Sequence, residues 1–155
     1  MRLRWMLTVA ALGLGAATAV ADDGGPYVGA SVGYSTLHER AFGAVDFLVQ
    51  VNHSFTVVPN VSFLQTGDLN RWTTGVELQW NAPTYRLHPK LLAWAGGGLA
   101  VITEDPRGPL DPTTRDLVAN AVAGVGYDAP ATPFVQLRVT LRDPADVGLA
   151  VGVRF

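Results

Sequence analysis

The chain ends in a segment, residues 147–155, that reads VGLAVGVRF. Every second position from Val147 to Phe155 carries a large apolar side chain. The intervening positions carry small residues and one arginine: Gly148, Ala150, Gly152 and Arg154. Because successive side chains of a β-strand point to opposite faces, this pattern predicts a strand with one oily face.

The same period of two recurs upstream, in segments of about 9–12 residues separated by Gly, Pro, Asp and Asn. It is clear in residues 71–80 and 134–142 and weaker in the Gly- and Ala-rich segments. The sequence therefore predicts eight strands, namely Tyr27–Thr36, Phe42–Asn52, Thr56–Gln65, Arg71–Trp80, Leu91–Thr103, Leu117–Asp128, Phe134–Arg142 and Val147–Phe155.

The composition of the second face indicates which solvent surrounds the sheet. The outward face of a soluble barrel is normally dense with charged residues. Here the polar face carries mainly Gly, Ser, Thr, Asn and Gln, with single charges at Asp46, Glu77, Arg138 and Arg154. We therefore expect this face to line a narrow lumen and the apolar face to contact lipid. Since an open sheet edge cannot exist in hydrocarbon, the predicted fold is an all-β, eight-stranded, antiparallel up-and-down transmembrane barrel.

Composition bounds the remaining possibilities. The chain has 155 residues, of which 48% are hydrophobic and 15% charged, which suits a single ordered domain. Eleven basic residues against 13 acidic ones supply no positive field, so a nucleic-acid partner is not expected. The absence of cysteine excludes disulfides, thiolate nucleophiles and Cys-ligated metals.

Residues 1–21 have the pattern of a cleaved secretory signal peptide. Arg2 and Arg4 precede an apolar run, and Ala19-Val20-Ala21 forms a small-x-small cleavage site. The alternative is a retained transmembrane helix, but the run is short for a span. We expect a signal peptide at residues 1–21 and a barrel domain at residues 22–155.

With these features the chain resembles the small eight-stranded outer-membrane barrels of Gram-negative-type bacteria, the OmpA-transmembrane-domain and OmpX-like group. The likeness rests on Tyr27–Tyr34 soon after the signal peptide, the Gly-rich Ala95–Ala100 and the C-terminal strand. It implies an integral outer-membrane protein. The signal peptide predicts export, and no cofactor is expected. The short loops and the lack of a periplasmic domain after Phe155 differ from the better-known members, so loop-borne adhesion and peptidoglycan binding are not expected.

The resemblance also implies partners. Outer-membrane lipid and lipopolysaccharide would surround the barrel, which we expect to be a monomer. In this group a terminal strand with a final Phe is read by the barrel-assembly machinery. The corresponding residues here are Val147, Leu149, Val151, Val153 and Phe155.

Aromatic residues near the strand ends fit a girdle at the two membrane interfaces. Trp72 and Trp80 share one face, and a tilted strand would separate them by about 20 Å along the membrane normal. That distance approaches the apolar band of about 25 Å in outer-membrane barrels. The predicted girdle comprises Trp72, Trp80, Tyr34, Tyr127 and Phe155.

Four inward-facing charges, Asp46, Glu77, Arg138 and Arg154, predict an ionic network in the lumen, with Glu77 paired to Arg138. A charge in a narrow lumen must be paired, hydrogen-bonded or hydrated. Two roles remain open: a gate in a very narrow pore, or a structural plug in a closed barrel.

Catalysis and metal binding have weaker support. Some outer-membrane barrels are lipid A hydrolases that use a His, a Ser and a carboxylate near the outer rim. The histidines here are His38, His53 and His88; His53-Ser54 falls in a predicted periplasmic turn, and no third partner is evident. We predict no enzymatic activity. The acidic segment Asp22–Gly25 and the third loop could contact divalent cations, but neither has EF-hand spacing, and no metal site is predicted.

If Phe155 lies at the periplasmic end, the outer loops are Leu37–Ala41, Thr66–Asn70, Glu104–Asp116 and Asp143–Asp146. The main rival to a membrane barrel is a secreted, soluble, lipocalin-like barrel that binds an apolar small molecule. That rival would turn the apolar face inward. It lacks support because the outward face would then be nearly uncharged, and the chain has no early Gly-x-Trp or C-terminal helix pattern.

Overall fold

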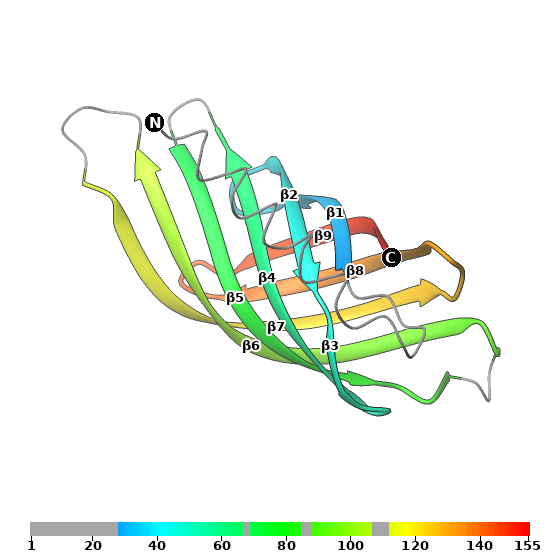
Figure 1. The fold of residues 1–155 in the computed structure, drawn as a ribbon. Coiled ribbons are helices and arrows are strands. Elements are labelled where there is room, and N and C mark those ends of the chain that lie inside the picture. The colour runs from blue at the N-terminus through cyan, green and yellow to red at the C-terminus, as the bar shows by residue number, and fades with distance from the viewer. Residues whose placement is uncertain (1–27, 67–68, 85–87, 107–111) are drawn as a thin grey trace.

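The computed structural model of the protein describes residues 28–66, 69–84, 88–106 and 112–155. These residues form strands β1 (Val28–Ser35), β2 (Arg40–Phe47), β3 (Val49–Asn52), β4 (Phe55–Gln65), β5 (Leu69–Asn81), β6 (Leu91–Pro106), β7 (Thr114–Tyr127), β8 (Thr132–Leu141) and β9 (Asp146–Arg154) (Figure 1). No helix in these described ranges is long and apolar enough to cross a bilayer. The expected signal peptide and the acidic segment Asp22–Gly25 lie outside the described residues.

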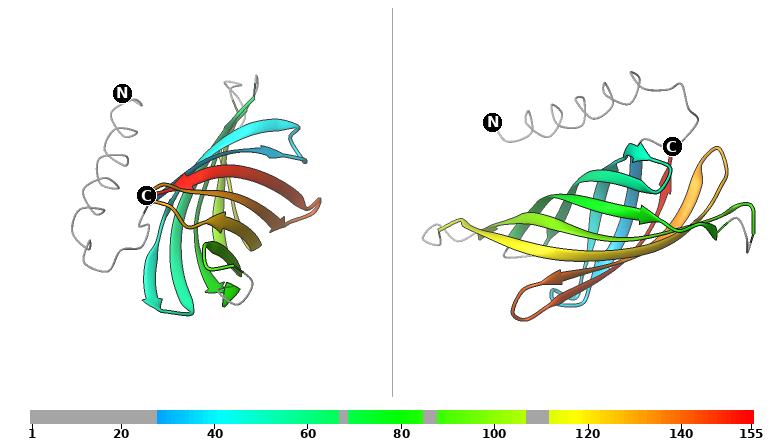
Figure 2. Two further views of the ribbon diagram at one scale, coloured as in Figure 1. Left: turned by 90° about the vertical axis from the view of Figure 1, so that its right-hand side faces the viewer. Right: turned by 90° about the horizontal axis from the view of Figure 1, so that it is seen from below.

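The sheet closes into a barrel. Each strand pairs antiparallel with the next one along the chain, apart from the interruption between β2 and β3, and β1 also pairs with β9. The backbone N–H of Phe155 donates to the carbonyl of Val28 over 2.8 Å. The strands wrap around a common axis, as the further views in Figure 2 show. The predicted all-β, eight-stranded, antiparallel barrel is confirmed.

The second predicted strand is interrupted. Residues 42–52 were expected to form one strand, but the structure divides them at Leu48 into β2 and β3, which share β4 as a partner. Alternation ends there, and Gln50 and Asn52, expected to face inward, are exposed. The reason is that β1 begins opposite Phe47, so among the described residues β3 is paired on one edge only and lies beyond the lumen.

The predicted orientation of the faces is confirmed. Large apolar side chains point outward; Val32 is 64% exposed and Leu149 is 54% exposed. Polar side chains point inward, and Glu77 is fully buried. This arrangement contradicts the lipocalin-like alternative, which requires the apolar side chains to face the cavity.

Glycine lets the inner side chains and neighbouring strands approach closely. A Cβ on Gly98 in β6 would collide with the carbonyl oxygen of Val76 in β5, and a Cβ on Gly124 in β7 would collide with the indole of Trp94. The Gly-rich segment seen in the sequence therefore makes room in the barrel wall and interior.

The barrel has two distinct ends. The terminal end holds Val28, Phe155 and the connections β3–β4, β5–β6 and β7–β8. The loop end holds the connections β1–β2, β4–β5, β6–β7 and β8–β9. At the loop end β6 and β7 extend to Pro106 and Thr114, so much of the predicted loop Glu104–Asp116 is strand, which corrects that expectation. The cause is cross-strand pairing with β5, which continues as far as Leu69 opposite Pro106.

Candidate functional site

A group of buried ions and amides crosses the middle of the lumen; we call Asp46, Glu77, Gln79, Asn120 and Arg138 the central cluster. In it, Arg138 Nε lies 2.8 Å from Glu77 Oε1, and Arg138 Nη2 lies 3.7 Å from Asp46 Oδ1. The two carboxylates are essentially inaccessible to solvent. The structure therefore brings together three of the four predicted lumen ions.

Two amides complete the coordination of Glu77. Gln79 Nε2 donates to Glu77 Oε2 over 2.9 Å, and Asn120 Nδ2 donates to Glu77 Oε1 over 3.1 Å. Both are inward-facing strand residues, but neither carries a charge that would single it out in the sequence. They supply the hydrogen bonds that a buried carboxylate requires in addition to its ion pair.

The fourth predicted ion, Arg154, has a different environment, although it lies near the central cluster. Its guanidinium carbon is 3.7 Å from the centre of the Trp94 ring and 5.0 Å from that of Phe134. Trp94 Nε1 in turn donates to Gln136 Oε1 over 3.1 Å. We call Trp94, Phe134, Gln136 and Arg154 the terminal stack, because they fill the lumen toward the terminal end.

The terminal stack joins the central cluster through one contact. Arg154 Nη2 lies 3.5 Å from Gln79 Oε1, at the limit of a hydrogen bond. Arg154 is thus held mainly by aromatic faces, which attract a guanidinium through the ring quadrupole. An ion pair with a carboxylate, the arrangement implied for a lumen network, is not among its contacts with the described residues.

A second ionic group, which was not predicted from the sequence, lies at the loop end. We call Ser35, His38, Arg71, Glu104, Arg142 and Asp146 the rim cluster. Arg71 Nη1 lies 3.3 Å from Asp146 Oδ2, and Arg71 Nε lies 4.0 Å from Glu104 Oε1. Arg142 Nη1 pairs with Glu104 Oε1 at 3.1 Å.

The turn between β1 and β2 is tied to this cluster. Ser35 Oγ donates to Asp146 Oδ1 over 2.8 Å, and the backbone N–H of Leu37 donates to the same oxygen over 3.3 Å. The Nε2 atom of His38 contacts Arg71 Nη1. Burial and the nearby Arg71 charge lower the pKa of His38 below its usual value.

Strand parity could have found the rim cluster. Arg71 has the same parity as Glu77 in β5, and Asp146 has the same parity as Arg154 in β9. Charges near the strand ends resemble those of solvated loops, which hides this alternation in the sequence. If the alternation is continued to the ends of the strands, Arg71 and Asp146 are predicted to face the lumen.

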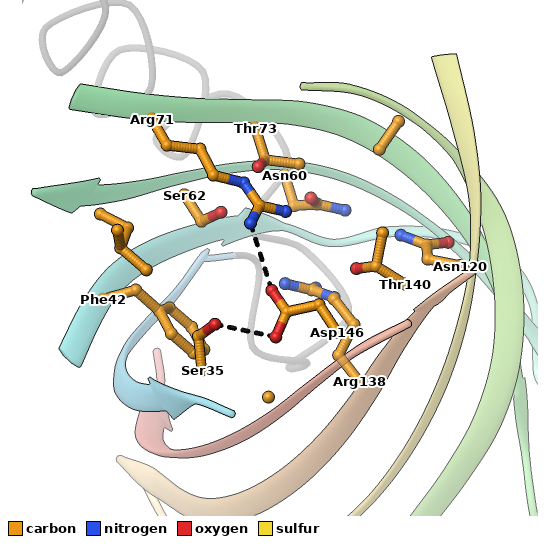
Figure 3. A pocket seen from close by; sticks show the side chains of 13 residues that line it. Ser35, Phe42, Asn60, Ser62, Arg71, Thr73, Asn120, Arg138, Thr140 and Asp146 are labelled. Carbon is orange, nitrogen blue, oxygen red and sulfur yellow. Dashed lines mark hydrogen bonds and ion pairs between the residues drawn. The ribbon is translucent and has the colours of Figure 1, made fainter. Parts of the chain in front are cut away.

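A cavity of about 50 Å³ separates the two clusters, with room for a few water molecules (Figure 3). We call it the lumen chamber. Arg71 and Asp146 line it toward the loop end, and Asn120 and Arg138 line it toward the middle. The remaining lining residues are Ser35, Phe42, Asn60, Ser62, Leu64, Thr73, Ala100, Thr140 and Gly148.

Two buried atoms beside the chamber have no hydrogen-bond partner among the described residues: Asn120 Oδ1, an acceptor, and Arg138 Nη2, a donor. The orientation of the Asn120 amide is fixed because its Nδ2 must face Glu77. One bridging water could satisfy both atoms. The chamber therefore offers hydrogen-bond partners for water.

The predicted girdle residues lie on the outer face. Trp80, Tyr127, Tyr34 and Phe155 are exposed, and Lys90 Nζ is 5.8 Å from the centre of the Tyr127 ring. Trp72 is partly covered by Phe63, with ring centres 4.3 Å apart. Of the predicted assembly residues, Leu149, Val151 and Phe155 are exposed, while Val147 and Val153 are half-buried.

The histidines do not form a nucleophilic site with serine among the described residues. His53 and Ser54 lie exposed in the β3–β4 turn, and His88 is exposed near Tyr127. At the rim, Ser35 Oγ donates to Asp146, and only the backbone N–H of His38 reaches Ser35 Oγ, at 3.4 Å. In a Ser–His pair the imidazole accepts the proton of the serine hydroxyl, whereas the Ser35 hydroxyl donates to a carboxylate. The described ranges also contain no group of His, Asp and Glu arranged to hold a metal ion.

Solved structures share the architecture. The N-terminal β-barrel domain of Pseudomonas aeruginosa OprF matches with a TM-score of 0.66 and 14% identity, over 83% of this chain and 95% of that one. Neisserial surface protein A (NspA) matches with a TM-score of 0.60 and 12% identity, over 82% and 91%. The outer membrane enzyme PagL matches with a TM-score of 0.54 and 11% identity, over 83% and 97%.

No protein-family model matches the sequence, and no curated protein matches it. The structural likenesses confirm the resemblance to small eight-stranded outer-membrane barrels at the level of the fold.

Proposed function

We propose that this protein is an integral outer-membrane barrel with a structural or lipid-interacting role, no catalytic activity and a lumen closed to solutes. The observation that carries the proposal is the filling of the lumen. The central cluster and the terminal stack occupy it in succession, and Glu77, Gln79 and Gln136 are buried to within a few per cent. The two layers are in contact, because Arg154 Nη2 lies 3.5 Å from Gln79 Oε1 while its guanidinium stacks on Trp94.

The closed lumen favours the structural plug over the gate. Opening a pore would separate Arg138 from Glu77, leave buried charges unpaired and withdraw the two amides from the carboxylate. Removing one partner of a buried ion pair costs about 3–5 kcal/mol. Thermal fluctuation alone would populate such an open state in fewer than about one molecule in a hundred.

Planar-bilayer conductance tests the proposal. We expect no steady conductance from the wild-type barrel or from Glu77→Gln, because the terminal stack still blocks the lumen when the ion pair is weakened. Asp128→Asn, which changes an exposed carboxylate after β7, is the matched control. Discrete conductance steps in the wild type would support the narrow-pore alternative, and steps only in Glu77→Gln would make the cluster a gate.

The outer surface supports the lipid-interacting part of the proposal. Exposed Val, Leu and aromatic side chains cover the barrel wall, as a surface facing acyl chains requires. The partners we propose are therefore outer-membrane lipid and lipopolysaccharide, with the barrel-assembly machinery acting on β9 during biogenesis and a monomer as the final state. The protein should sediment with outer membranes and migrate faster on a gel when unboiled.

Catalysis has a direct test. The absence of a Ser–His pair among the described rim residues supports a non-catalytic role, although the chain shares its fold with one outer-membrane enzyme. Mass spectrometry of lipid A incubated with the purified barrel should show no loss of acyl chains. A mass loss that disappears in Ser35→Ala would reverse this conclusion.

A further inference from the structure

The contact between His38 and Arg71 depends on the protonation state of the imidazole. A guanidinium offers only hydrogen-bond donors, so the Nε2 atom that faces Arg71 must act as an acceptor. A neutral imidazole has one such nitrogen, whereas a protonated imidazole has none. The observed arrangement therefore belongs to the neutral form of His38.

Charged groups from four elements surround the imidazole. Arg71 in β5 and Arg142 after β8 oppose its protonation, while Glu104 in β6 and Asp146 in β9 favour it. After protonation the ring and Arg71 would face each other as two donors with like charge and must separate. Protonated His38 would instead compete with Arg71 for Asp146 and Glu104, the two carboxylates that favour its charge, so the expected change is confined to the rim cluster and leaves the barrel closed.

The same arginine forms part of the lumen chamber. Arg71 lines the chamber from the loop end together with Ser35 and Asp146, and Figure 3 shows its guanidinium pointing toward Asp146 across the cavity. The β1–β2 turn that carries His38 is attached to the same two residues. Movement of the imidazole would therefore affect the residues that close the chamber at the loop end, namely Ser35, Arg71 and Asp146.

We propose that His38 is an acid-operated latch at the loop end of the lumen chamber: the neutral ring keeps Arg71 across the mouth, and the protonated ring releases it. Once Arg71 is released, the chamber admits water and small polar solutes from the loop end. They reach as far as the central cluster, which remains closed. The lowered pKa of His38 keeps the latch shut at neutral pH and confines its release to acidic conditions.

A single introduced cysteine can report the opening, since the chain has none of its own. Ser62→Cys places a thiol in the chamber, and Thr113→Cys places one on the exposed surface of the loop end. Each purified variant, in detergent, is treated with a charged methanethiosulfonate at about pH 7.5 and about pH 4.5. Dividing the labelling rate of the Ser62→Cys variant by that of the Thr113→Cys variant removes the dependence of thiol reactivity on pH.

We expect this ratio to rise at least about fivefold on acidification with His38 present, which corresponds to a free-energy change of about 1 kcal/mol. In a His38→Gln background the ratio should be the same at both pH values. A ratio independent of pH with His38 present, or a rise that persists in His38→Gln, would overturn the latch.

A second measurement needs no substitution. Nitrogen-15 spectra of the three histidines in micelles report the protonation of each ring across the titration. The latch requires the Arg71 side-chain resonances to shift with the His38 titration. Arg71 resonances that stay constant while His38 titrates would disprove it.

Discussion

The central cluster and the rim cluster use the same chemistry in two environments. Each contains two carboxylates and arginine, yet Glu77 in the middle is fully buried while Glu104 and Arg142 at the rim retain about a fifth of their side-chain exposure. The central ions are fixed by amides, whereas the rim ions share their partners with a histidine. Depth in the barrel therefore decides whether an ion pair is a fixed support or a group that responds to solvent.

The largest effect is expected in the middle. Glu77→Gln removes the charge opposite Arg138 at full burial, so the free energy of unfolding should fall by about 3–5 kcal/mol. Urea unfolding of the barrel in lipid vesicles measures this loss of unfolding free energy. The exposed control Asp128→Asn should change stability by less than about 0.5 kcal/mol. If Glu77→Gln and Asp128→Asn lowered the free energy of unfolding equally, burial would not explain the importance of Glu77.

A smaller effect is expected at the rim. Arg71→Gln takes one charged donor from Asp146, which keeps the hydrogen bonds from Ser35 and Leu37. The loss of unfolding free energy should be about 1–3 kcal/mol in the same assay. The control is Arg40→Gln, an exposed arginine at the same end of the barrel. A loss larger than that of Glu77→Gln would reverse the ranking of the clusters.

The terminal stack is a third case, because its arginine has no carboxylate partner among the described residues. Arg154→Gln should cost about 0.5–2 kcal/mol, the range of a partly desolvated cation–π contact. Unfolding of Trp94→Phe in both arginine backgrounds would isolate the contribution of this ring. If Arg154→Gln destabilised the barrel as much as Glu77→Gln, a hidden ion pair would have to hold the arginine.

The smallest effect concerns pH. The folded pKa of His38 lies below 6.5, so the unfolded chain binds more protons than the folded barrel as the pH falls through this value. The stability that His38 contributes is complete above pH 6.5 and declines below it, until the ring is protonated in both states. Unfolding curves from about pH 8 to about pH 5 should show this decline in the wild type. The free energy of unfolding should decline less with falling pH in His38→Gln. Identical slopes in the wild type and the variant would mean that carboxylates, not His38, cause the pH dependence.

Alternation in the sequence predicted a large part of this molecule. In the C-terminal strand and residues 71–80 it indicated the correct face for the large side chains, and Glu77 and Arg138 were expected to pair, as the 2.8 Å contact between them shows. These predictions worked because the period of two follows from backbone geometry, which does not depend on the neighbouring strands.

The errors occurred where pairing overrides the local pattern. The β6–β7 hairpin continues through residues that resemble a loop, because β5 supplies partners as far as Leu69. At Leu48 the sequence pattern of a strand continues but the strand is interrupted, because the pairing of β1 with β2 ends at Val28 opposite Phe47. For Arg154, an inward-facing charge was predicted, but its stacking on the Trp94 ring at 3.7 Å was not.

Strand periodicity, the identity of the oily face and hence the barrel class follow from the sequence alone, because they depend only on the order of side chains along the backbone. Which ions meet depends on tertiary structure, since strand register brings Arg71 to Asp146 from distant parts of the chain. The same holds for where the lumen is filled and where a chamber remains, because packing volume depends on side chains from all strands at one height.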